Sequence, residues 1–249
     1  MLIYNPLKIL LEVGFIKIYS WGFLFVLGII LAWILAVKLS KKQKIKTIHI
    51  HIGTLIALIT TILGSRILYI LFNLKEFNNF LKIFKIWDGG MIFYGGFILA
   101  LSSWFIYFKI NNINLSKIFD ITGLSLLLAG SLTRIGCFLN WCCYGIQSNL
   151  PWAVKVGNDI ARHPTQLYSA FFLFLSFMIL YQIYKRNPSP GIISGIIFLL
   201  YGSFRFLIEF IRYYPQQYYI LNLTVSQLIS IGLIIIGLII LFYKKYHKK

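Results

Sequence analysis

The stretch GSLTRIGCFLNWCCYG, residues 130–145, places a permanent cation and three thiols in an otherwise apolar region of the chain. Arg134 carries a planar guanidinium whose fork of N–H donors matches the oxygens of a phosphate. An arginine inside a membrane-spanning helix costs about 2.5–3.5 kcal/mol on insertion scales, so it normally faces a partner or a wet cavity. We therefore expect Arg134 to bind an anion. The alternative is that it satisfies backbone carbonyls near the end of a helix.

The thiols of Cys137, Cys142 and Cys143 follow Arg134 within nine residues and allow several interpretations. A zinc site usually needs three or four ligands at defined spacing, and C-x4-C-C with one distant histidine is a weak match. Small apolar packing and a disulfide on an oxidising face are the favoured interpretations, and a thiol-redox role is a weaker one. The sequence thus predicts no metal site and no cofactor.

Two further arginines lie within apolar runs. Arg205 and Glu209 in FRFLIEFIRYYP are spaced i, i+4 and share one helix face. They form either a buried salt bridge that neutralises both, or a pair in which Arg212 shares Glu209 and Arg205 keeps a donor face for a ligand. For Arg66 in GSRILYILF, snorkelling or pairing with an acidic residue is as plausible as contact with a ligand.

The elements that must position these residues are membrane-spanning helices. The chain has 249 residues, 59% hydrophobic and only 12% charged, whereas a soluble domain carries roughly twice that charged fraction. We expect an all-α polytopic membrane protein with a single integral domain, 1–249, and a short outer-surface segment, 1–18. A span needs about 20 mostly apolar residues. The seven expected spans are roughly 19–38, 51–73, 91–109, 118–139, 165–184, 191–212 and 223–243.

The net charge of +18 does not indicate nucleic-acid binding, because the basic residues sit in short clusters between apolar runs. Lysines gather after the first, third and fifth expected spans and in the C-terminal tail. Since cytoplasmic loops carry an excess of lysine and arginine, we expect the N-terminus outside and the C-terminus in the cytoplasm.

This orientation predicts an outer-leaflet pocket. Arg66, Arg134 and Arg205 each fall about 22–25 Å from the inner edge of a hydrocarbon core roughly 30 Å thick, at 1.5 Å of helix rise per residue. Three cations at one level favour an anion site. Other residues expected near this level are Tyr94, Trp21, Ser20 and His163.

On these motifs the chain resembles the bacterial prolipoprotein diacylglyceryl transferases. The resemblance runs essentially end to end through the segments IYSWGFLF, GSRILYILF, WDGGMIFYGGFI, GSLTRIGCFLN…YG, RHPTQLY, RFLIEFIR and LTVSQLISI. It implies a multi-pass enzyme of the bacterial inner membrane whose active site faces the outer leaflet. Such an enzyme moves the diacylglyceryl group of phosphatidylglycerol to the lipobox cysteine of a prolipoprotein signal peptide, releasing glycerol phosphate.

The resemblance also implies roles for individual residues. Arg134 matches the signature arginine and Arg205 a second essential arginine, both tied to the phospholipid headgroup. Gly145 matches the glycine that closes the signature, and Glu209 and Arg212 fit the family pattern.

Five positions depart from that pattern. Trp21 stands where a tyrosine is expected, Tyr94 where a histidine is, Cys137 where an asparagine is, and Cys142 and Ser169 where glutamates are. Phosphate-binding positions are thus kept while proton-handling positions are not. The alternatives to the family reaction are the same chemistry on another acceptor and a non-catalytic lipid-binding membrane protein.

The expected mechanism needs a thiolate nucleophile and a stabilised leaving phosphate. Arg134 and Arg205 are the expected catalytic cations. Tyr94 would orient the headgroup or take the proton, although a phenol with a pKa near 10 is a poor base, and His163 is the alternative base. The expected substrate-binding residues are Arg134, Arg66, Arg205, Gly145, Trp21 and Glu209.

Overall fold

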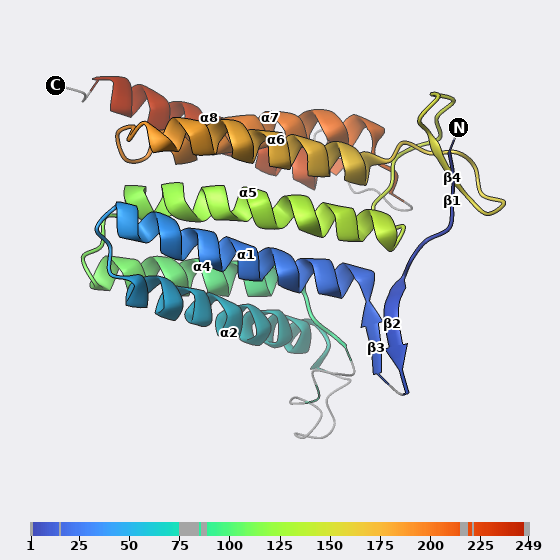
Figure 1. Ribbon diagram of the computed structural model, residues 1–249, viewed down its shortest axis with the longest axis horizontal. Helices are drawn as coiled ribbons and strands as arrows, with labels where there is room; N and C mark the ends of the chain where they lie inside the picture. Colours follow the sequence, from blue (N-terminus) through green and yellow to red (C-terminus); the bar gives the residue numbers. More distant parts are fainter. Residues whose placement is uncertain are drawn as a thin grey trace. The chain divides into compact units, whose positions relative to one another are not determined.

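The computed structural model describes residues 2–14, 16–74, 85, 89–214, 219–220 and 222–246. Within these residues, seven helices are long and apolar enough to cross a membrane, which confirms the predicted all-α fold with about seven spans (Figure 1). They are α1 (Ser20–Lys42), α2 (Thr47–Phe72), α4 (Phe93–Ile110), α5 (Leu115–Leu139), α6 (Thr165–Lys185), α7 (Ile192–Ile208) and α8 (Val225–Tyr246). A 3-10 turn, η3 (Glu209–Ile211), extends α7.

The chain divides into two compact units. The first unit combines Met1–Leu35 with Phe119–Lys249 and contains most of α1 and α5 together with α6, α7 and α8. The second unit, Ala36–Ile118, contains α2 and α4 with the end of α1 and the start of α5. The expectation of a single integral domain, like the expected direction of insertion, stays a prediction.

Close backbone contacts at glycines hold the helices of the first unit together. A Cβ on Gly136 of α5 would lie 3.1 Å from the Cα of Trp21, so α1 and α5 touch there through backbone. A Cβ on Gly202 of α7 would lie 2.9 Å from the carbonyl oxygen of Ser230 in α8. Small residues at helix crossings allow this approach in a membrane, where helix association depends on packing.

A buried carboxylate fixes α7 against α5. Asp120 accepts 2.7 Å hydrogen bonds from the backbone N–H of Gly191 and of Ser194, so it satisfies two donors at the start of α7 that have no partner within the helix. Both helices continue from this contact in the same direction (Figure 1). Arg134 lies fourteen residues beyond Asp120, and Arg205 fourteen beyond Gly191. At about 1.5 Å per residue the contact therefore sets the two arginines at a similar level.

Short strands occupy the segment before α1, where the sequence predicted only a surface stretch. Strand β1 (Leu2–Tyr4) pairs in parallel with β4 (Val154–Val156). Strands β2 (Ile9–Val13) and β3 (Ile16–Tyr19) form an antiparallel pair. The pairing satisfies backbone groups that no helix uses. Between η3 and α8, β5 (Tyr219–Ile220) forms an antiparallel pair with β6 (Leu223–Thr224).

In the second unit, α2 and α4 lie side by side (Figure 1). The contact is made by glycines: a Cβ on Gly64 would collide with the carbonyl of Gly95, and one on Gly95 with the carbonyl of Gly64. A Cβ on Gly96 would lie 2.7 Å from the carbonyl oxygen of Thr61. The second glycine pair of WDGGMIFYGGFI therefore allows close helix packing.

Candidate functional site

The three arginines occupy equivalent places in their own helices. Arg66 lies six residues before the last residue of α2, Arg134 five before the last of α5, and Arg205 six before Ile211 at the end of the η3 extension. Each therefore lies about 8–9 Å from the end of its helix. That all three share one level of a membrane stays a prediction, because Arg66 belongs to the second unit and the others to the first.

Arg134 has an uncommitted guanidinium. The side chain is half-buried on α5 and makes no hydrogen bond or ion pair with any residue among those the structure describes. Its positive charge acts on Cys143 in the loop that follows the helix. A half-buried fork of donors without a protein partner is what binding of a phosphate or carboxylate requires.

Arg205, by contrast, has its terminal nitrogens engaged. Its Nη1 forms an ion pair with Oε2 of Glu209, and its Nη2 donates to Ser226 Oγ at 2.8 Å and to the Tyr214 hydroxyl at 3.2 Å. Glu209 is 4% exposed and also accepts from the Thr224 hydroxyl at 3.0 Å. The structure thus contains the buried salt bridge, which ties the end of α7 to the start of α8.

Arg212 does not share the Glu209 carboxylate within the described residues. Its guanidinium lies over the Tyr214 ring, 5.0 Å from the ring centroid, and its buried Nε has no hydrogen-bond partner. The arrangement in which Arg212 frees Arg205 for a ligand is therefore not the one observed.

Arg66 binds backbone carbonyls. Its Nη1 donates to the carbonyls of Gly89 at 2.7 Å and Gly90 at 3.1 Å, and its Nη2 to that of Lys85 at 3.2 Å. The Arg66 side chain is 8% exposed. These bonds therefore give the buried guanidinium its acceptors and give the backbone carbonyls before α4 a donor. The sequence did not lead us to consider these carbonyl partners, and pairing with an acidic residue or a ligand stays a prediction.

The two aromatic candidates lie at helix starts and are largely exposed. Tyr94, in the first turn of α4, is 52% exposed, and its hydroxyl makes no hydrogen bond with any described residue. Trp21, in the first turn of α1, is 42% exposed and stacks on Phe25 with ring centroids 5.3 Å apart. Tyr94 belongs to the second unit and Arg134 to the first, so a pocket that contains both stays a prediction.

Gly145 lies where only a glycine fits. Its N–H donates to the His163 carbonyl at 2.8 Å, and it forms an isolated bridge with Arg212. A Cβ at this position would lie 2.5 Å from the carbonyl oxygen of Ile211 and 2.6 Å from the Cβ of His163. Gly145 therefore holds three segments together, the loop after α5, the segment before α6 and the end of α7.

His163 is oriented by a neighbouring tyrosine. Its Nδ1 lies 3.3 Å from the Tyr168 hydroxyl, which also accepts a 2.8 Å hydrogen bond from Nε1 of Trp152. The other ring nitrogen, Nε2, has no partner among the described residues, so it is available to exchange a proton. Sequence reasoning missed Tyr168, although it closes the RHPTQLY motif, because its contact with His163 depends on how the chain enters α6.

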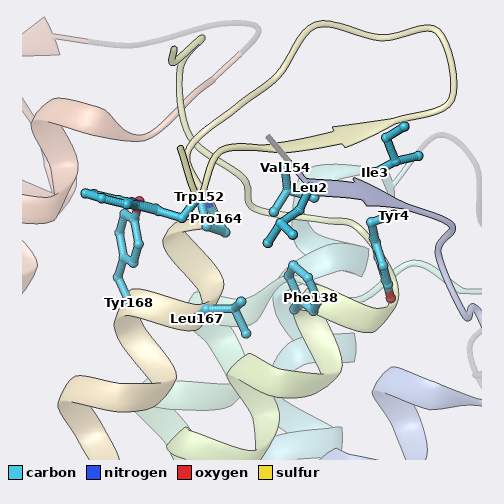
Figure 2. A pocket seen from close by; sticks show the side chains of 9 residues that line it. All are labelled: Leu2, Ile3, Tyr4, Phe138, Trp152, Val154, Pro164, Leu167 and Tyr168. Carbon is cyan, nitrogen blue, oxygen red and sulfur yellow. The ribbon is translucent and has the colours of Figure 1, made fainter. Parts of the chain in front are cut away.

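An apolar pocket of about 400 Å³ opens beside this group (Figure 2). The chain that forms it comes from β1, the end of α5, β4 and the start of α6, and Leu2 and Val154 converge on Phe138 in the view shown. The pocket suits apolar groups only. Its lining residues are Leu2, Ile3, Tyr4, Phe138, Trp152, Val154, Pro164, Leu167 and Tyr168. Nothing in the sequence pointed to it, because the parallel pairing of β1 with β4 has no local signal.

The three cysteines converge. Their Sγ atoms all lie within 4.8 Å of one another, and all three thiols are free, so the disulfide interpretation does not hold in this structure. Cys137 is buried at the end of α5, Cys142 is half-buried and Cys143 is exposed. Trp141 and Cys143 have φ angles of 52° and 61°. This left-handed backbone folds the loop back over the helix end, a geometry that residue spacing does not predict.

The first turn of α6 holds this loop in place. The Thr165 hydroxyl donates to the Cys143 carbonyl at 2.8 Å, and the Gln166 amide to the Cys142 carbonyl at 2.7 Å. Both side chains are buried. The TQ pair of RHPTQLY thus positions the cysteines.

The surroundings of the two loop thiols shift the pKa of Cys142 and the pKa of Cys143 in opposite directions. Hydrogen bonding to the thiols of Cys137 and Cys142 and the positive charges of Arg212 and Arg134 lower the pKa of Cys143. The hydrogen bonds with Cys137 and Cys143 and burial raise the pKa of Cys142. Cys143 is therefore the more acidic of the two thiols.

Comparison with known proteins places these features in a family. A family model described as prolipoprotein diacylglyceryl transferase matches residues 8–243. A phosphatidylglycerol--prolipoprotein diacylglyceryl transferase of Clostridium tetani is 34% identical over 247 residues, covering 97% of this chain and 99% of the relative. The enzyme of that name from Finegoldia magna is 36% identical over 233 residues, covering 92% and 93%. One from Wolbachia pipientis is 34% identical over 244 residues, covering 93% and 92%. The chain is a multi-pass membrane protein that belongs to the prolipoprotein diacylglyceryl transferase family.

Proposed function

We propose that the protein transfers the diacylglyceryl group of phosphatidylglycerol to the lipobox cysteine of a prolipoprotein, in the outer leaflet of a bacterial inner membrane. Family membership and the names of the relatives support this assignment. The single observation of the structure that carries it is the uncommitted guanidinium of Arg134 on a membrane-spanning helix. A cation in that position needs an anion, and a phospholipid headgroup supplies one.

The reaction forms a bond between the acceptor sulfur and the glyceryl carbon and breaks the bond from that carbon to the phosphate oxygen. The electron pair of the broken bond stays on the phosphate, which leaves as glycerol phosphate, and the thiol proton is lost. Arg134 would hold the phosphate and offset the charge that grows on it as the bond breaks. Arg205 would have a structural role and would not contact the phosphate. Its ion pair with Glu209 keeps the end of α7 in place.

Among the described residues of the first unit, the geometry favours His163 as the acceptor of the thiol proton. His163 is oriented through Nδ1 by Tyr168 and leaves Nε2 unpartnered among the described residues. An unpartnered imidazole nitrogen has a lone pair that can accept a proton, and the Tyr94 hydroxyl is oriented by no described residue. We therefore favour His163 over Tyr94 as the general base.

A lipidation assay tests the proposal. The chain is produced in a bacterium depleted of its own transferase, together with a tagged lipobox precursor. We expect the precursor to gain the mass of a diacylglyceryl group, and we expect Arg134→Ala to abolish the gain. Arg186→Ala, which removes an exposed arginine just after α6, is the matched control and should lipidate normally.

Two other outcomes would replace the proposal. Consumption of phosphatidylglycerol without modification of the precursor would assign the same chemistry to another acceptor. Phosphatidylglycerol that copurifies with the wild-type protein and is not consumed would assign a non-catalytic lipid-binding role, which the replaced positions Cys137, Cys142 and Tyr94 would then explain.

A further inference from the structure

We propose that Cys137, Cys142 and Cys143 form a binding site for a single zinc ion with one coordination position left open. The three sulfurs already form one group, with every Sγ within 4.8 Å of the other two. A zinc–thiolate bond is about 2.3 Å long, which places the sulfurs of a tetrahedral site about 3.8 Å apart. The thiols therefore need to move by no more than about 1 Å.

The chain around the sulfurs is held by contacts that do not involve the thiols. The Cys142 N–H donates to the Cys137 carbonyl at 3.0 Å, and the buried side chains of Thr165 and Gln166 hold the carbonyls of Cys143 and Cys142. A site whose ligands are fixed before the metal arrives loses less conformational freedom on binding. The backbone that carries the three sulfur ligands is thus preorganised before any ion binds.

The charge balance also suits a divalent cation. Three thiolates and one Zn²⁺ carry a net charge of −1, which is costly in a partly buried site unless positive charge lies near. Arg134 and Arg212 both act electrostatically on Cys143. Without a metal, three ionised thiols at this separation would repel one another. A thiophilic ion removes that repulsion, and Arg212, which the proposed function does not use, offsets the negative charge that remains.

Structural zinc sites are closed by four protein ligands, whereas catalytic sites keep a position for an exogenous group. Within the described residues the cluster offers three ligands and no fourth. Its exposed member, Cys143, shows that the cluster is reachable from outside. The fourth position is therefore available to a ligand that arrives from solution.

The acceptor thiol is the ligand of matching chemistry, and this step rests on the proposed function. A thiol that coordinates zinc loses its proton outright, so the metal would deliver the nucleophile as a thiolate. The thiol proton passes through solvent to His163, the base of the proposed function, and no oxidant or reductant is required.

Metal analysis of the full chain in detergent tests the site without relying on activity. The protein carries an affinity tag free of histidine and cysteine. We expect about one zinc per chain, and we expect Co²⁺ substitution to give thiolate-to-metal charge-transfer absorption. Replacing all three cysteines by serine should remove both signals, and the variant's elution profile and thermal unfolding would show that it remains folded.

Each single Cys→Ser variant should weaken zinc binding by more than the roughly 10–100-fold that loss of an outer-shell partner costs. His51→Ala, remote from the cluster in the sequence, is the matched control and should keep the metal. Three results would overturn the site: a folded wild-type chain without stoichiometric zinc or the cobalt band, zinc retained by the triple serine variant, or a disulfide among the three cysteines in the purified protein.

A second arm tests the open position. Adding a lipobox peptide to the cobalt protein should strengthen the charge-transfer band as a fourth sulfur binds, and the same peptide with serine in place of cysteine should not. An unchanged band on a metal-loaded protein would overturn the acceptor role and leave the site intact. Failure of the lipidation assay in a protein that binds both metal and peptide would instead count against the proposed function.

Discussion

Arg134 and Arg205 are the same residue type at a similar level of two helices, yet their partners differ. The guanidinium of Arg205 binds Glu209, Tyr214 and Ser226, whereas that of Arg134 binds no described residue. A cation that is already neutralised has little left to offer a phosphate, while an unpaired one in an apolar helix gains most from binding. The difference in partners, which sequence cannot show, therefore separates the candidate phosphate ligand from the structural arginine.

Arg134→Ala should lower kcat/KM for lipidation by about 10²–10³, which is the usual effect of removing a donor that stabilises developing negative charge. Arg134→Lys keeps the charge but loses the planar fork, so it should fall between the wild type and alanine. The measurement is initial-rate lipidation of a lipobox peptide in phosphatidylglycerol micelles. An alanine variant as fast as the wild type would remove Arg134 from the mechanism.

Gly145→Ala should destabilise the protein by about 1–3 kcal/mol, the usual cost of overpacking. The added methyl group would meet backbone and side-chain atoms of Ile211 and His163 at 2.5–2.6 Å. Thermal unfolding in detergent measures the change. Gly232→Ala is the control, because a Cβ on that α8 residue meets nothing within 4 Å. Equal unfolding midpoints for the two variants would show that the tight junction is not rigid.

At the scale of elements, apolar run length alone predicted the helices well. The expected span 165–184 is observed as Thr165–Lys185, and 118–139 as Leu115–Leu139, because a membrane helix satisfies its backbone locally and leaves a continuous apolar signature. The strands and the apolar pocket were not predicted. They depend on pairing between Leu2–Tyr4 and Val154–Val156, about 150 positions apart, for which no local pattern exists.

Contacts at both ends of α7 fix its position against α5 and α8, and a substitution at each end tests its contact. At the start, Asp120→Asn leaves only one carbonyl oxygen to serve the N–H groups of Gly191 and Ser194. We expect a loss of about 0.5–2 kcal/mol of stability, as for other lost helix caps. The surface variant Glu12→Gln, which changes a carboxylate that is 50% exposed and pairs with the exposed Lys17, should change stability by about 0.5 kcal/mol or less. Thermal unfolding of both variants gives the comparison, and similar losses would contradict the capping role.

At the other end of α7, Glu209→Gln should destabilise by about 3–5 kcal/mol, because it leaves the charge of Arg205 buried without its partner. Replacing the pair together, Arg205→Met with Glu209→Leu, should recover much of that loss. Activity measured on the double variant then separates two roles. A stable double variant that still lipidates would assign Arg205 to structure, and a stable but inactive one would return it to the phosphate site.

At the scale of the whole molecule, the family assignment extends over nearly all of the chain, from residue 8 to residue 243. Within that frame, Cys137, Cys142 and Cys143 form one group of sulfurs, which the spacing C-x4-C-C alone does not predict. Their convergence depends on left-handed backbone at Trp141 and Cys143. The helices that carry the chemistry were thus predictable, and the chemistry of this loop was not.

The parallel pairing of β1 with β4 has a consequence for how the protein is made. Leu2–Tyr4 are synthesised before their partner Val154–Val156, which follows α1, α2, α4 and α5. Contacts between such distant segments form late, after the intervening chain has been ordered. Strand β1 therefore waits without this partner until these four described helices have been synthesised, and the pocket that it lines is completed only then.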